Sequence, residues 1–372
     1  MMLPNGWKKV KLGDVANVFD GTHQTPVYVN QGVPFVSVEN IEDVWGTDKF
    51  ITQEAFDAYP EKPQKGDILM TRITAGVIGR TAIIDSNEPL AYYVSLALIR
   101  NSKGEFVSEF LSQFIEGCFF KSELNKRIIH TAFPKKINLN DIGKCEVILP
   151  PLEEQKKIAA TLSVWDSAIE KMEKLIEAKE SGHAFLMNEM LKNSKTWDCT
   201  CLSDIATIKK GKQLNAVDMI SDGAYYVMNG GITPSGNTDD WNTAENTISI
   251  SEGGNSCGFV AFNKEKFWAG GHCYTLIDLN ENISVKFLFH YLKNMEKEIM
   301  AMRVGSGLPN IQKDSISDIK VFYPSKKGQE RISGVLDDSL SEIALLKQQL
   351  ENYKKQKQGL MQKLLAGEWR VK

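Results

Sequence analysis

The sequence lacks any apolar run long enough to cross a membrane. Its longest, Leu90–Ile99, is about half of the roughly 20 residues that a spanning helix needs. The first residues, MMLPNGWKKVKLGD, contain no apolar segment of the kind found in secretion signals. These absences predict a cytoplasmic protein that does not bind a membrane.

An excess of charge of one sign is also missing. The 372 residues contain 44 Lys+Arg against 47 Asp+Glu, a formal net charge of -3. Nucleic-acid-binding domains usually carry an excess of positive charge, so a role of that kind has to depend on local patches. Hydrophobic residues make up 42% and charged residues 24%, which is typical of a globular protein, and the length predicts two or three domains.

Cysteine is sparse and scattered, which argues against a disulfide scaffold. Only Cys199 and Cys201 lie close together, and no histidine pair lies near them, so they do not form a zinc signature. We expect buried or structural thiols and no bound metal. The six cysteines are at positions 118, 145, 199, 201, 257 and 273.

Catalytic motifs are absent as well. The chain has no G-x-x-x-x-G-K-[ST] loop, no G-x-G-x-x-G after a strand, no G-x-S-x-G and no H-E-x-x-H. The N/D-P-P-Y motif of amino methyltransferases is missing too. An E-x-K pattern, which metal-dependent nucleases combine with further acidic residues, occurs at Glu177-Ala178-Lys179, but inside a helical segment. We therefore predict a non-catalytic chain that binds no cofactor of its own.

What the sequence does contain is an internal repeat. The opening Trp7–Gly21 returns at Trp197–Gly211, with Trp, Leu, Asp, Ala and Gly matched at an offset of 190. The segment Pro150–Leu162 returns at Pro324–Leu336 at an offset of 174. The difference, 190 minus 174, makes the globular part of the first copy 16 residues longer than that of the second. Each half therefore consists of a variable globular module and a better-matched segment.

The better-matched segments, roughly 152–193 and 326–367, have apolar residues at alternating spacings of four and three and no proline after the first turn. This pattern predicts long helices of about 60 Å with a narrow apolar seam, which must pack against a partner. If the repeat is a pseudo-two-fold, the two helices form an antiparallel coiled coil within the chain. Pairing of each helix with another protein is the alternative. We expect the polar seam residues Lys179, His183 and Lys357 to fix register or to open the seam locally, not to carry chemistry.

The modules have the mixed pattern of an α/β (α+β) fold with short strands. The predicted boundaries are 1–150 and 196–324 for the modules, and 151–195 and 325–372 for the helices. We expect strands at Val33–Val38, Asp67–Arg72, Ala91–Arg100, Tyr225–Met228, Thr247–Ser251 and Tyr274–Leu279, and module helices at Glu105–Arg127 and Val285–Arg303.

Local basic clusters make both modules candidates for binding an anionic polymer. Lysine, arginine and histidine gather between residues 121 and 144, and lysines again at 209–213. Positive side chains contact phosphates, whereas Arg, Lys, Asn, Gln, Ser and Thr also read base edges. Glycine-rich segments at 74–80 and 252–258 could bring such residues close to a ligand. For any single residue an ordinary solvated surface is the alternative.

Taken together, these motifs resemble those of a known family over essentially the whole chain. The motifs are the two W-x4-L-x-D-[VI]-A openings, the Gln155–Ile158 and Gln329–Ile332 segments after strand-end prolines, the long helix after each, and the closing Leu364–Arg370. The chain resembles the DNA-specificity subunits of type I restriction-modification systems.

The resemblance implies two target-recognition domains, each reading one half of a bipartite, asymmetric site on double-stranded DNA. Spacer helices would set the gap between the half-sites. It also implies that catalysis belongs to partners: two adenine-methylating modification subunits, and restriction subunits that translocate and cut. Those partners would use S-adenosylmethionine, ATP and Mg, and this chain none of them.

The resemblance does not assign contact residues, since recognition domains vary with their target, so we selected polar residues of the turns and glycine-rich segments. As DNA contacts we predict Thr22, His23, Gln24, Arg72, Thr74, Lys135 and Lys136 in the first module, and Lys212, Gln213, Asn229, Ser251, Asn255 and Arg303 in the second. As methyltransferase contacts on exposed helix faces we predict Glu153, Gln155, Gln329 and Arg331. As framework we assign Trp7, Trp197, Asp14 and Asp204, the aspartates as helix caps.

Two other functions are compatible with parts of the pattern. The second hypothesis is a coiled-coil scaffold whose two modules bind protein. A self-sufficient methyltransferase is disfavoured by the missing cofactor and catalytic motifs. Neither the target sequence nor the length of the gap between half-sites follows from the residues.

Overall fold

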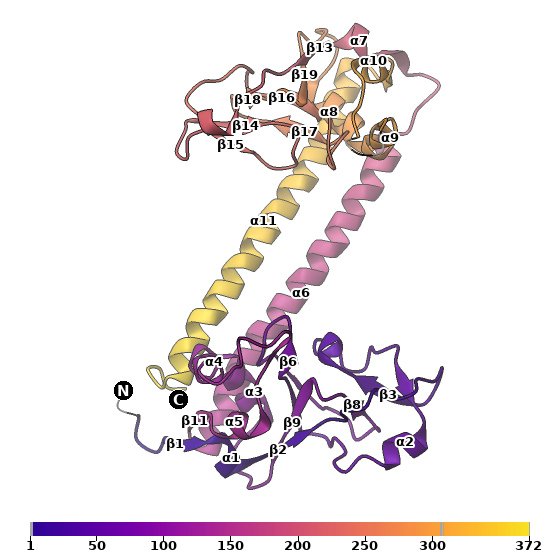
Figure 1. The fold of residues 1–372 in the computed structure, drawn as a ribbon. Coiled ribbons are helices and arrows are strands. Elements are labelled where there is room, and N and C mark those ends of the chain that lie inside the picture. The colour runs from indigo at the N-terminus through magenta and orange to yellow at the C-terminus, as the bar shows by residue number, and fades with distance from the viewer. Residues whose placement is uncertain (1–2, 306, 308, 372) are drawn as a thin grey trace. The chain divides into compact units, whose positions relative to one another are not determined.

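The computed structural model describes residues 3–305, 307 and 309–371, and the chain divides into two compact units. Unit 1 comprises the described parts of 1–172 and 349–372, and unit 2 comprises those of 173–348. Each of the two long helices, α6 (Leu152–Met190) and α11 (Lys326–Leu365), contributes one part to each unit (Figure 1). We call the residues before α6 module 1 and those between α6 and α11 module 2. The expected mixed α/β class with two long helices is confirmed.

Module 1 is built on an antiparallel four-stranded sheet of order β2-β9-β5-β7, beside a three-stranded sheet of order β4-β3-β8. Two further strand pairs are β1-β11 and β6-β10. The strands are β1 Lys8–Lys11, β2 Ala16–Asp20, β3 Val33–Val36, β4 Phe50–Ile51, β5 Ile68–Thr71, β6 Ile73–Thr74, β7 Thr81–Ile83, β8 Ala91–Tyr92, β9 Leu96–Asn101, β10 Lys135–Lys136 and β11 Glu146–Leu149. The helices are α1 Leu12–Val15, α2 Gln53–Asp57, α3 Ser108–Glu116, α4 Cys118–Asn125 and α5 Leu139–Gly143, with a 3-10 turn at Val38–Asn40.

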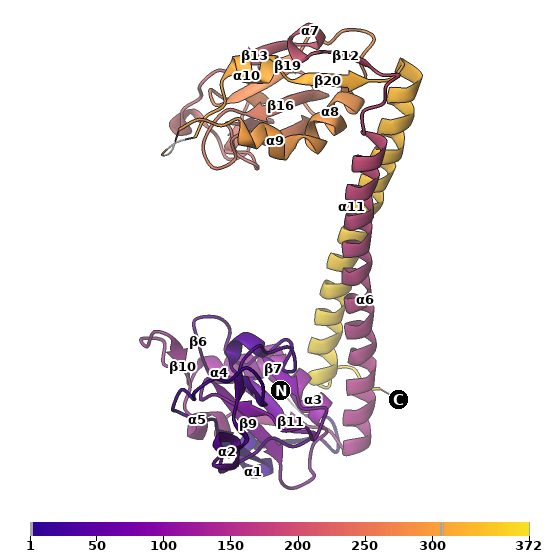
Figure 2. The same cartoon turned by 90° about the vertical axis from the view of Figure 1, so that its right-hand side faces the viewer.

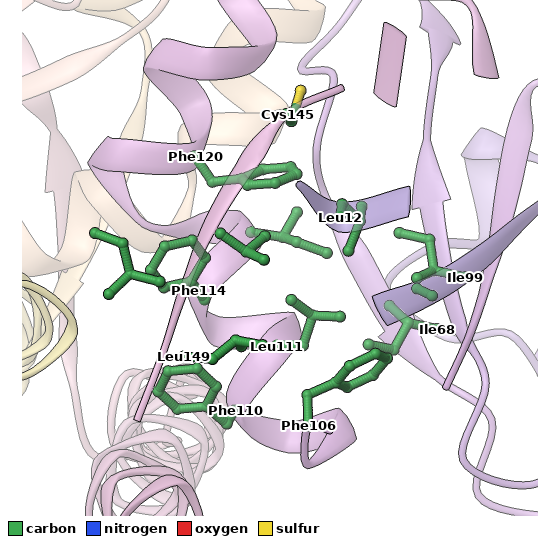
Figure 3. Packing of buried hydrophobic residues seen from close by; sticks show 14 of the residues in the cluster. Leu12, Ile68, Ile99, Phe106, Phe110, Leu111, Phe114, Phe120, Cys145 and Leu149 are labelled. Atoms are coloured by element: carbon green, nitrogen blue, oxygen red, sulfur yellow. The ribbon is translucent and has the colours of Figure 1, made fainter. Parts of the chain in front are cut away.

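The main core of unit 1 joins the module to both long helices. Phenylalanines of α3 and α4, such as Phe110 and Phe120, face Leu12 and strand residues in this core (Figure 3). Ile158 from α6 and Leu364 from α11 belong to the same buried cluster. The long helices are therefore part of the module's folding body, because removing them would expose its apolar core.

Module 2 repeats the strand order of module 1. Its four-stranded sheet has the order β13-β19-β16-β17, its three-stranded sheet β15-β14-β18, and β12 pairs with β20. The strands are β12 Asp198–Cys201, β13 Thr207–Lys210, β14 Tyr225–Met228, β15 Gly236–Thr238, β16 Thr247–Ser251, β17 Val260–Asn263, β18 Trp268–Ala269, β19 Cys273–Ile277 and β20 Lys320–Tyr323. The helices are α7 Leu202–Ile205, α8 Val285–Asn294, α9 Glu296–Ala301 and α10 Lys313–Ser317, with a 3-10 turn at Ala216–Asp218.

Several sequence expectations match these bounds, and one strand does not. The strands β14 and β16 coincide with the predicted Tyr225–Met228 and Thr247–Ser251. The single strand predicted at Ala91–Arg100 is wrong, because the chain turns where the Leu96 amide donates to the Tyr93 carbonyl (2.9 Å). The first part, β8, pairs with β3, and the second, β9, pairs with β2 and β5, so the chain changes sheets there.

The two predicted module helices are each divided in the structure. The helix expected at Glu105–Arg127 breaks at Gly117, whose φ of -72° and ψ of 158° are extended. The helix expected at Val285–Arg303 breaks at Met295, which is non-helical with ψ of 10°. In both modules the second piece, α4 or α9, can therefore turn its apolar residues into the core independently of the first.

In unit 1 the end of α11 runs alongside the start of α6 (Figures 1 and 2). Trp165 packs edge-on against Tyr353 with ring centroids 6.0 Å apart. Lys357, one of the polar seam residues, forms an ion pair with Asp166. The seam lysine thus has an acidic partner on the facing helix instead of an unpaired charge.

The parts of the two helices in unit 2 make comparable contacts. Lys179 forms a 2.7 Å ion pair with Glu342, and His183 Nδ1 lies 3.1 Å from the Ser339 hydroxyl. Burial lowers the pKa of His183, which favours the neutral ring at this position. Lys179 and His183, the polar seam residues of this unit, thus each have a polar partner on the facing helix.

A buried glutamine near the start of α6 attaches this helix to module 1. Gln155 Oε1 accepts a hydrogen bond from the Val107 amide (2.9 Å). Its Nε2 donates to the carbonyls of Glu105 (3.1 Å) and Pro150 (2.8 Å). The expectation that Gln155 lies on an exposed face is wrong. Its side chain is buried and makes hydrogen bonds to backbone groups of two chain segments inside the fold.

Gln329 occupies the same position on α11 and makes the same set of bonds. Its Oε1 accepts from the Ser284 amide (2.8 Å), and its Nε2 donates to the carbonyls of Asn282 and Pro324, both at 3.0 Å. It is also buried, so its predicted exposure is wrong for the same reason. Glu153 and Arg331, in contrast, are exposed as expected.

We expect Gln155→Ala to lower the free energy of unfolding of the chain by about 2 to 4 kcal/mol, because it leaves one amide and two carbonyls without their partner. Urea denaturation measures the change. Glu153→Ala, two residues away on the same helix, is the matched control and should shift the free energy by no more than about 0.5 kcal/mol. Equal losses in the two variants would contradict the attachment role.

Acidification should destabilise unit 2 through a buried histidine. His290 is 1% exposed, and its Nε2 lies 2.9 Å from Asp337 Oδ1. Burial lowers the pKa of His290 below its ordinary value, and the Asp337 carboxylate offsets this only in part. The unfolded chain therefore binds a proton more readily, so stability falls as the pH drops through about 6.5.

The measurement is the free energy of unfolding at about pH 7.5 and about pH 5.5 for the natural chain and for His290→Gln. Asp337 remains ionised across this window, because hydrogen bonds from Lys286 and His290 outweigh its burial and lower its pKa. The variant should lose less stability on acidification than the natural chain. An unchanged pH dependence would show that His290 is not the group responsible.

Candidate nucleic-acid interface

A charged pair in module 1 joins the ends of β2 and β5, the two strands on either side of β9. Arg72, directly after β5, donates from Nη2 to Asp20 Oδ1 at the end of β2 (2.8 Å) and from Nη1 to the Ile137 carbonyl (3.1 Å). Asp20 Oδ2 lies 2.7 Å from His23 Nε2. Arg72 is buried, so its side chain holds Asp20 and the Ile137 segment in place, and its predicted DNA contact stays a prediction.

The loop after β2 presents the other predicted residues of this end of the sheet. Thr22, His23 and Gln24 line an open cavity of about 800 Å³, together with Asp20 and the start of α2. His23 and Gln24 are exposed, and the Thr22 hydroxyl donates to the Gln24 carbonyl (3.3 Å). The structure thus brings these three residues and Arg72 together around Asp20, which the sequence did not single out.

The two-stranded ribbon β6-β10 presents the remaining residues predicted for module 1. Lys135 is the register partner of Thr74, and Lys136 that of Ile73. Both lysines are exposed, and within residues 3–305, 307 and 309–371 neither forms an ion pair. Because the Ile137 carbonyl next to this ribbon accepts from Arg72, the ribbon and the Asp20 loop are tied to the same side chain.

Half of the six Lys/Arg side chains between residues 121 and 144 are neutralised by acidic partners. Buried Glu123 forms ion pairs with Lys126 (2.6 Å) and Arg127 (2.9 Å). Lys144 pairs with Asp141 at 2.9 Å. Among the described residues, the positive charge of this cluster that has no ion-pair partner is therefore left at Lys121 and at the two β10 lysines.

Module 2 has a charged pair at the corresponding ends of its strands. Lys210 is the last residue of β13, and its Nζ donates to Oε1 of Glu252, the residue after β16 (2.6 Å). The Tyr274 hydroxyl donates to the same oxygen (3.0 Å), and His272 Nδ1 lies 3.6 Å from Oε2. Glu252 is buried, and its Oε2 has no hydrogen-bond partner in the described part of the chain.

The glycine that closes both repeated openings is required by close backbone approach. A Cβ on Gly211 would lie 2.2 Å from the Gly270 carbonyl oxygen, and a Cβ on Gly21 would lie 2.5 Å from that of Tyr93. Because glycine has no Cβ, the chain that leaves β2 or β13 can pass this close to the neighbouring backbone. In module 2 the chain then continues into Lys212, so this glycine positions a predicted contact.

Three predicted residues of module 2 gather around the loop between β18 and β19. The Lys212 amide donates to the Ala269 carbonyl (2.9 Å), and the Lys212 side chain is exposed. Gln213 is exposed beside Gly271. Asn229 Oδ1 accepts from the His272 amide (3.2 Å), so this half-buried side chain partly fixes the loop.

The other three predicted residues differ in exposure. Ser251 is buried and donates to the Gly230 carbonyl (2.5 Å), so its side chain supports the neighbouring loop from inside. Asn255 and Arg303 are exposed. Arg303 lies near enough to Cys257 for its charge to oppose the rise in the pKa of that thiol caused by burial.

The described residues hold no cluster of three or more metal-binding side chains, and their helices include none long and apolar enough to span a bilayer. All six cysteines, each of them described, are free. Cys145, Cys257 and Cys273 are buried as expected, whereas Cys118 and Cys199 are exposed. Burial raises the pKa of Cys145 and of Cys273 to about 12.

Comparison with known proteins decides the family. The family model of the type I restriction modification DNA specificity domain matches twice, at residues 4–180 and 194–354. The chain belongs to this specificity family. The two matches follow the two repeats, and the resemblance found in the motifs is confirmed.

Curated relatives in this specificity family match part or all of the chain. A putative type I specificity subunit of Mycoplasma genitalium is 30% identical over 42% of this chain and 42% of its own length. One from Mycoplasma pneumoniae is 34% identical over 35% of each chain, so these two relatives are matched over well under half of their length. A putative type I restriction enzyme specificity subunit of Methanocaldococcus jannaschii is 24% identical over 100% of this chain and 95% of its own.

Solved structures share the fold of the specificity family. The crystal structure of a type I restriction-modification S subunit from M. genitalium aligns with a TM-score of 0.67 at 19% identity and covers 98% of both chains. A chain from a study of complex assembly and conformational transition in a type I R-M system aligns with a TM-score of 0.64 at 17% identity and covers 99% of this chain and 100% of its own.

The burial of the cysteines predicts which of them react with iodoacetamide in the folded chain. Cys118 and Cys199 should be alkylated rapidly, while Cys145 and Cys273 stay unmodified, because only the thiolate reacts and their thiols are buried and protonated. Peptide mass spectrometry before and after unfolding gives the result. Labelling of Cys145 in the folded chain at the rate of Cys118 would contradict the packing.

Proposed function

We propose that this chain is the sequence-specific DNA-binding subunit of a type I restriction-modification complex. Its two modules read the two halves of a bipartite, asymmetric target on double-stranded DNA, and partner subunits then methylate adenine or cut. The observation that carries the proposal is the repeated module, which the DNA specificity domain matches twice. The two copies share one strand order but have different polar residues at corresponding ends of the sheet.

The architecture belongs to the same proposal. Residues 1–150 and 196–324 are two target-recognition domains related by an internal duplication with pseudo-two-fold symmetry. Residues 151–195 and 325–372 form an antiparallel coiled coil that acts as the spacer between them. The support is the common strand order of the modules and the matched glutamines Gln155 and Gln329.

Catalysis falls to other subunits in this proposal. The chain binds two methyltransferase subunits and restriction/translocase subunits, acts in the cytoplasm, and holds no cofactor, while the partners use S-adenosylmethionine, ATP and Mg. The exposed residues at the helix starts, Glu153 and Arg331, remain our candidates for a methyltransferase contact. Gln155 and Gln329 are withdrawn from that surface, because they are buried.

The DNA contacts proposed are the exposed members of the predicted set. In module 1 these are the loop after β2 and the β10 lysines, with Thr74 beside them, and in module 2 the segment after β13, the glycine-rich loop and Arg303. Arg72, Ser251 and partly Asn229 support these loops from inside. The exposed or half-buried contacts are Thr22, His23, Gln24, Thr74, Lys135, Lys136, Lys212, Gln213, Asn255 and Arg303.

The test is the affinity of the full-length chain, with its methyltransferase partner, for a duplex selected from a random library. Replacing Lys135 and Lys136 together by glutamate should weaken binding at least about tenfold. It should also reduce the slope of log K against log salt concentration by about 0.9 for each phosphate that the variant no longer neutralises. Lys65→Glu is the control, because this exposed lysine precedes β5, at the opposite end of the strand from Arg72.

A protein-binding scaffold predicts a different outcome. Such a chain would select no sequence from the library and would lose no DNA affinity in the Lys135→Glu/Lys136→Glu variant. If the natural chain enriches no sequence in either half of a bipartite site, the DNA-recognition function is rejected.

A further inference from the structure

The charged pairs of the two modules occupy corresponding positions in the sheet. Asp20 ends β2, where its register partner on β9 is Ala97, and Lys210 ends β13, where its register partner on β19 is Tyr274. The two residues differ by 210 minus 20, the same offset of 190 that relates the repeated openings. Both strands lie at the same edge of their four-stranded sheets.

The inner residues of the pairs correspond as well, as their backbone bonds show. Arg72 and Glu252 each follow the last residue of a central strand, β5 or β16. The Arg72 amide donates to the Ser95 carbonyl and the Glu252 amide to the His272 carbonyl, both at 2.9 Å. The carbonyl of each then accepts an amide from the segment before α5 or α10, Ile137 at 3.0 Å and Ile311 at 2.8 Å.

The polarity of the pair is reversed between the modules. In module 1 the base is buried, with 7% of the Arg72 side chain exposed, and the acid Asp20 is the outer residue at 27%. In module 2 the acid is buried, with 5% of Glu252 exposed, and the base Lys210 is the outer residue at 52%. A buried charge needs a compensating partner, but the requirement is the same for either sign. The scaffold thus presents an acceptor in one module and a donor in the other.

The outer residues lie among the proposed DNA contacts. Asp20 lines the open cavity with Thr22 and Gln24 and holds His23, whose side chain is 71% exposed. Lys210 is followed at once by the segment that presents Lys212. Carboxylates accept hydrogen bonds from the amino group of cytosine, and lysine donates to O6 and N7 of guanine.

We propose that Asp20 and Lys210 are specificity-determining residues, which give the two modules opposite hydrogen-bonding preferences at corresponding positions. Asp20, together with the His23 that it orients, accepts from an exocyclic amino group of a base, and Lys210 donates to a guanine edge. Arg72 and Glu252 are their positioning residues. The inference rests on the proposed DNA-recognition function and assigns part of the asymmetry of the target to this reversal.

The experiment transplants the pair of one module into the other. The full-length chain, natural or carrying Asp20→Lys with Arg72→Glu, selects duplexes from a random library, and the bound DNA is sequenced. The variant should change its base preference at one or two positions of one half-site, with the original base disfavoured about tenfold or more, and leave the other half-site unaltered. Lys210→Asp with Glu252→Arg should alter only the other half-site.

The control reverses an exposed ion pair of module 1 that lies outside the proposed contacts. Glu39 and Lys49 are 3.0 Å apart, and Glu39→Lys with Lys49→Glu makes the same change of charges as the test variant. This control should select the natural sequence in both half-sites. A changed preference there would mean that any charge reversal disturbs recognition, and would overturn the assignment to Asp20 and Lys210.

Milder variants cover the case in which a transplanted pair does not fold. Asp20→Asn and Lys210→Met remove the charge with little change of size, and each should relax the preference at the same positions of its own half-site. If the natural chain enriches no sequence, the proposed function itself fails. If it enriches both half-sites, while the folded variants keep every preference or alter both half-sites alike, the specificity role is overturned.

Discussion

The fold of each unit depends on a glutamine buried where a long helix leaves its module. Gln155 and Gln329 stand at corresponding places in α6 and α11, and each satisfies one amide and two carbonyls that would otherwise be buried without partners. An unpaired buried backbone group costs about 1 to 3 kcal/mol, so the three bonds strongly favour one placement of helix against module. The apolar residues that follow, such as Ile158 in unit 1, can then enter the core.

This attachment separates what must stay constant from what can vary. The openings, the helix starts and the glycines at 21 and 211 meet requirements of packing, which are the same in both modules. At the sheet ends, packing requires only that each buried charge has a partner of opposite sign. The reversal of Asp20 and Arg72 into Lys210 and Glu252 shows this directly, because the pair exchanges signs while the surrounding backbone hydrogen bonds stay in place. A recognition surface can therefore change without a cost to the framework that supports it.

The sequence was informative where one local pattern decides the structure. Periodic apolar residues predicted α6 and α11 to within a few residues of their observed ends, and the repeat predicted two modules of mixed α/β structure. It failed at Ala91–Arg100, where apolar residues continue through a change of sheets and so hide the turn. It also placed Gln155 at the surface, because a polar residue on a helix is usually exposed and only the module's carbonyls make its burial favourable.

The charged pairs could not be predicted from the sequence, for a different reason. Their members are 52 residues apart in module 1 and 42 in module 2, so no local spacing connects them. The offset between the copies also changes from 190 at Asp20 to 252 minus 72, or 180, at Arg72, because the intervening loops differ in length. Only the strand register shows that these positions correspond, and with them that the polarity is reversed.

The pairing of charges also gives meaning to the near-neutral composition. Glu123 and Asp141 neutralise half of the six Lys/Arg side chains between residues 121 and 144, and the positive charge of this cluster without an ion-pair partner among the described residues is left at Lys121, Lys135 and Lys136. Fewer unpaired positive side chains on this surface mean fewer phosphate contacts, and so weaker binding to DNA of arbitrary sequence. A specificity subunit gains from this, because the ratio of specific to non-specific affinity, more than the affinity alone, decides whether a target is found among a genome's competing sites.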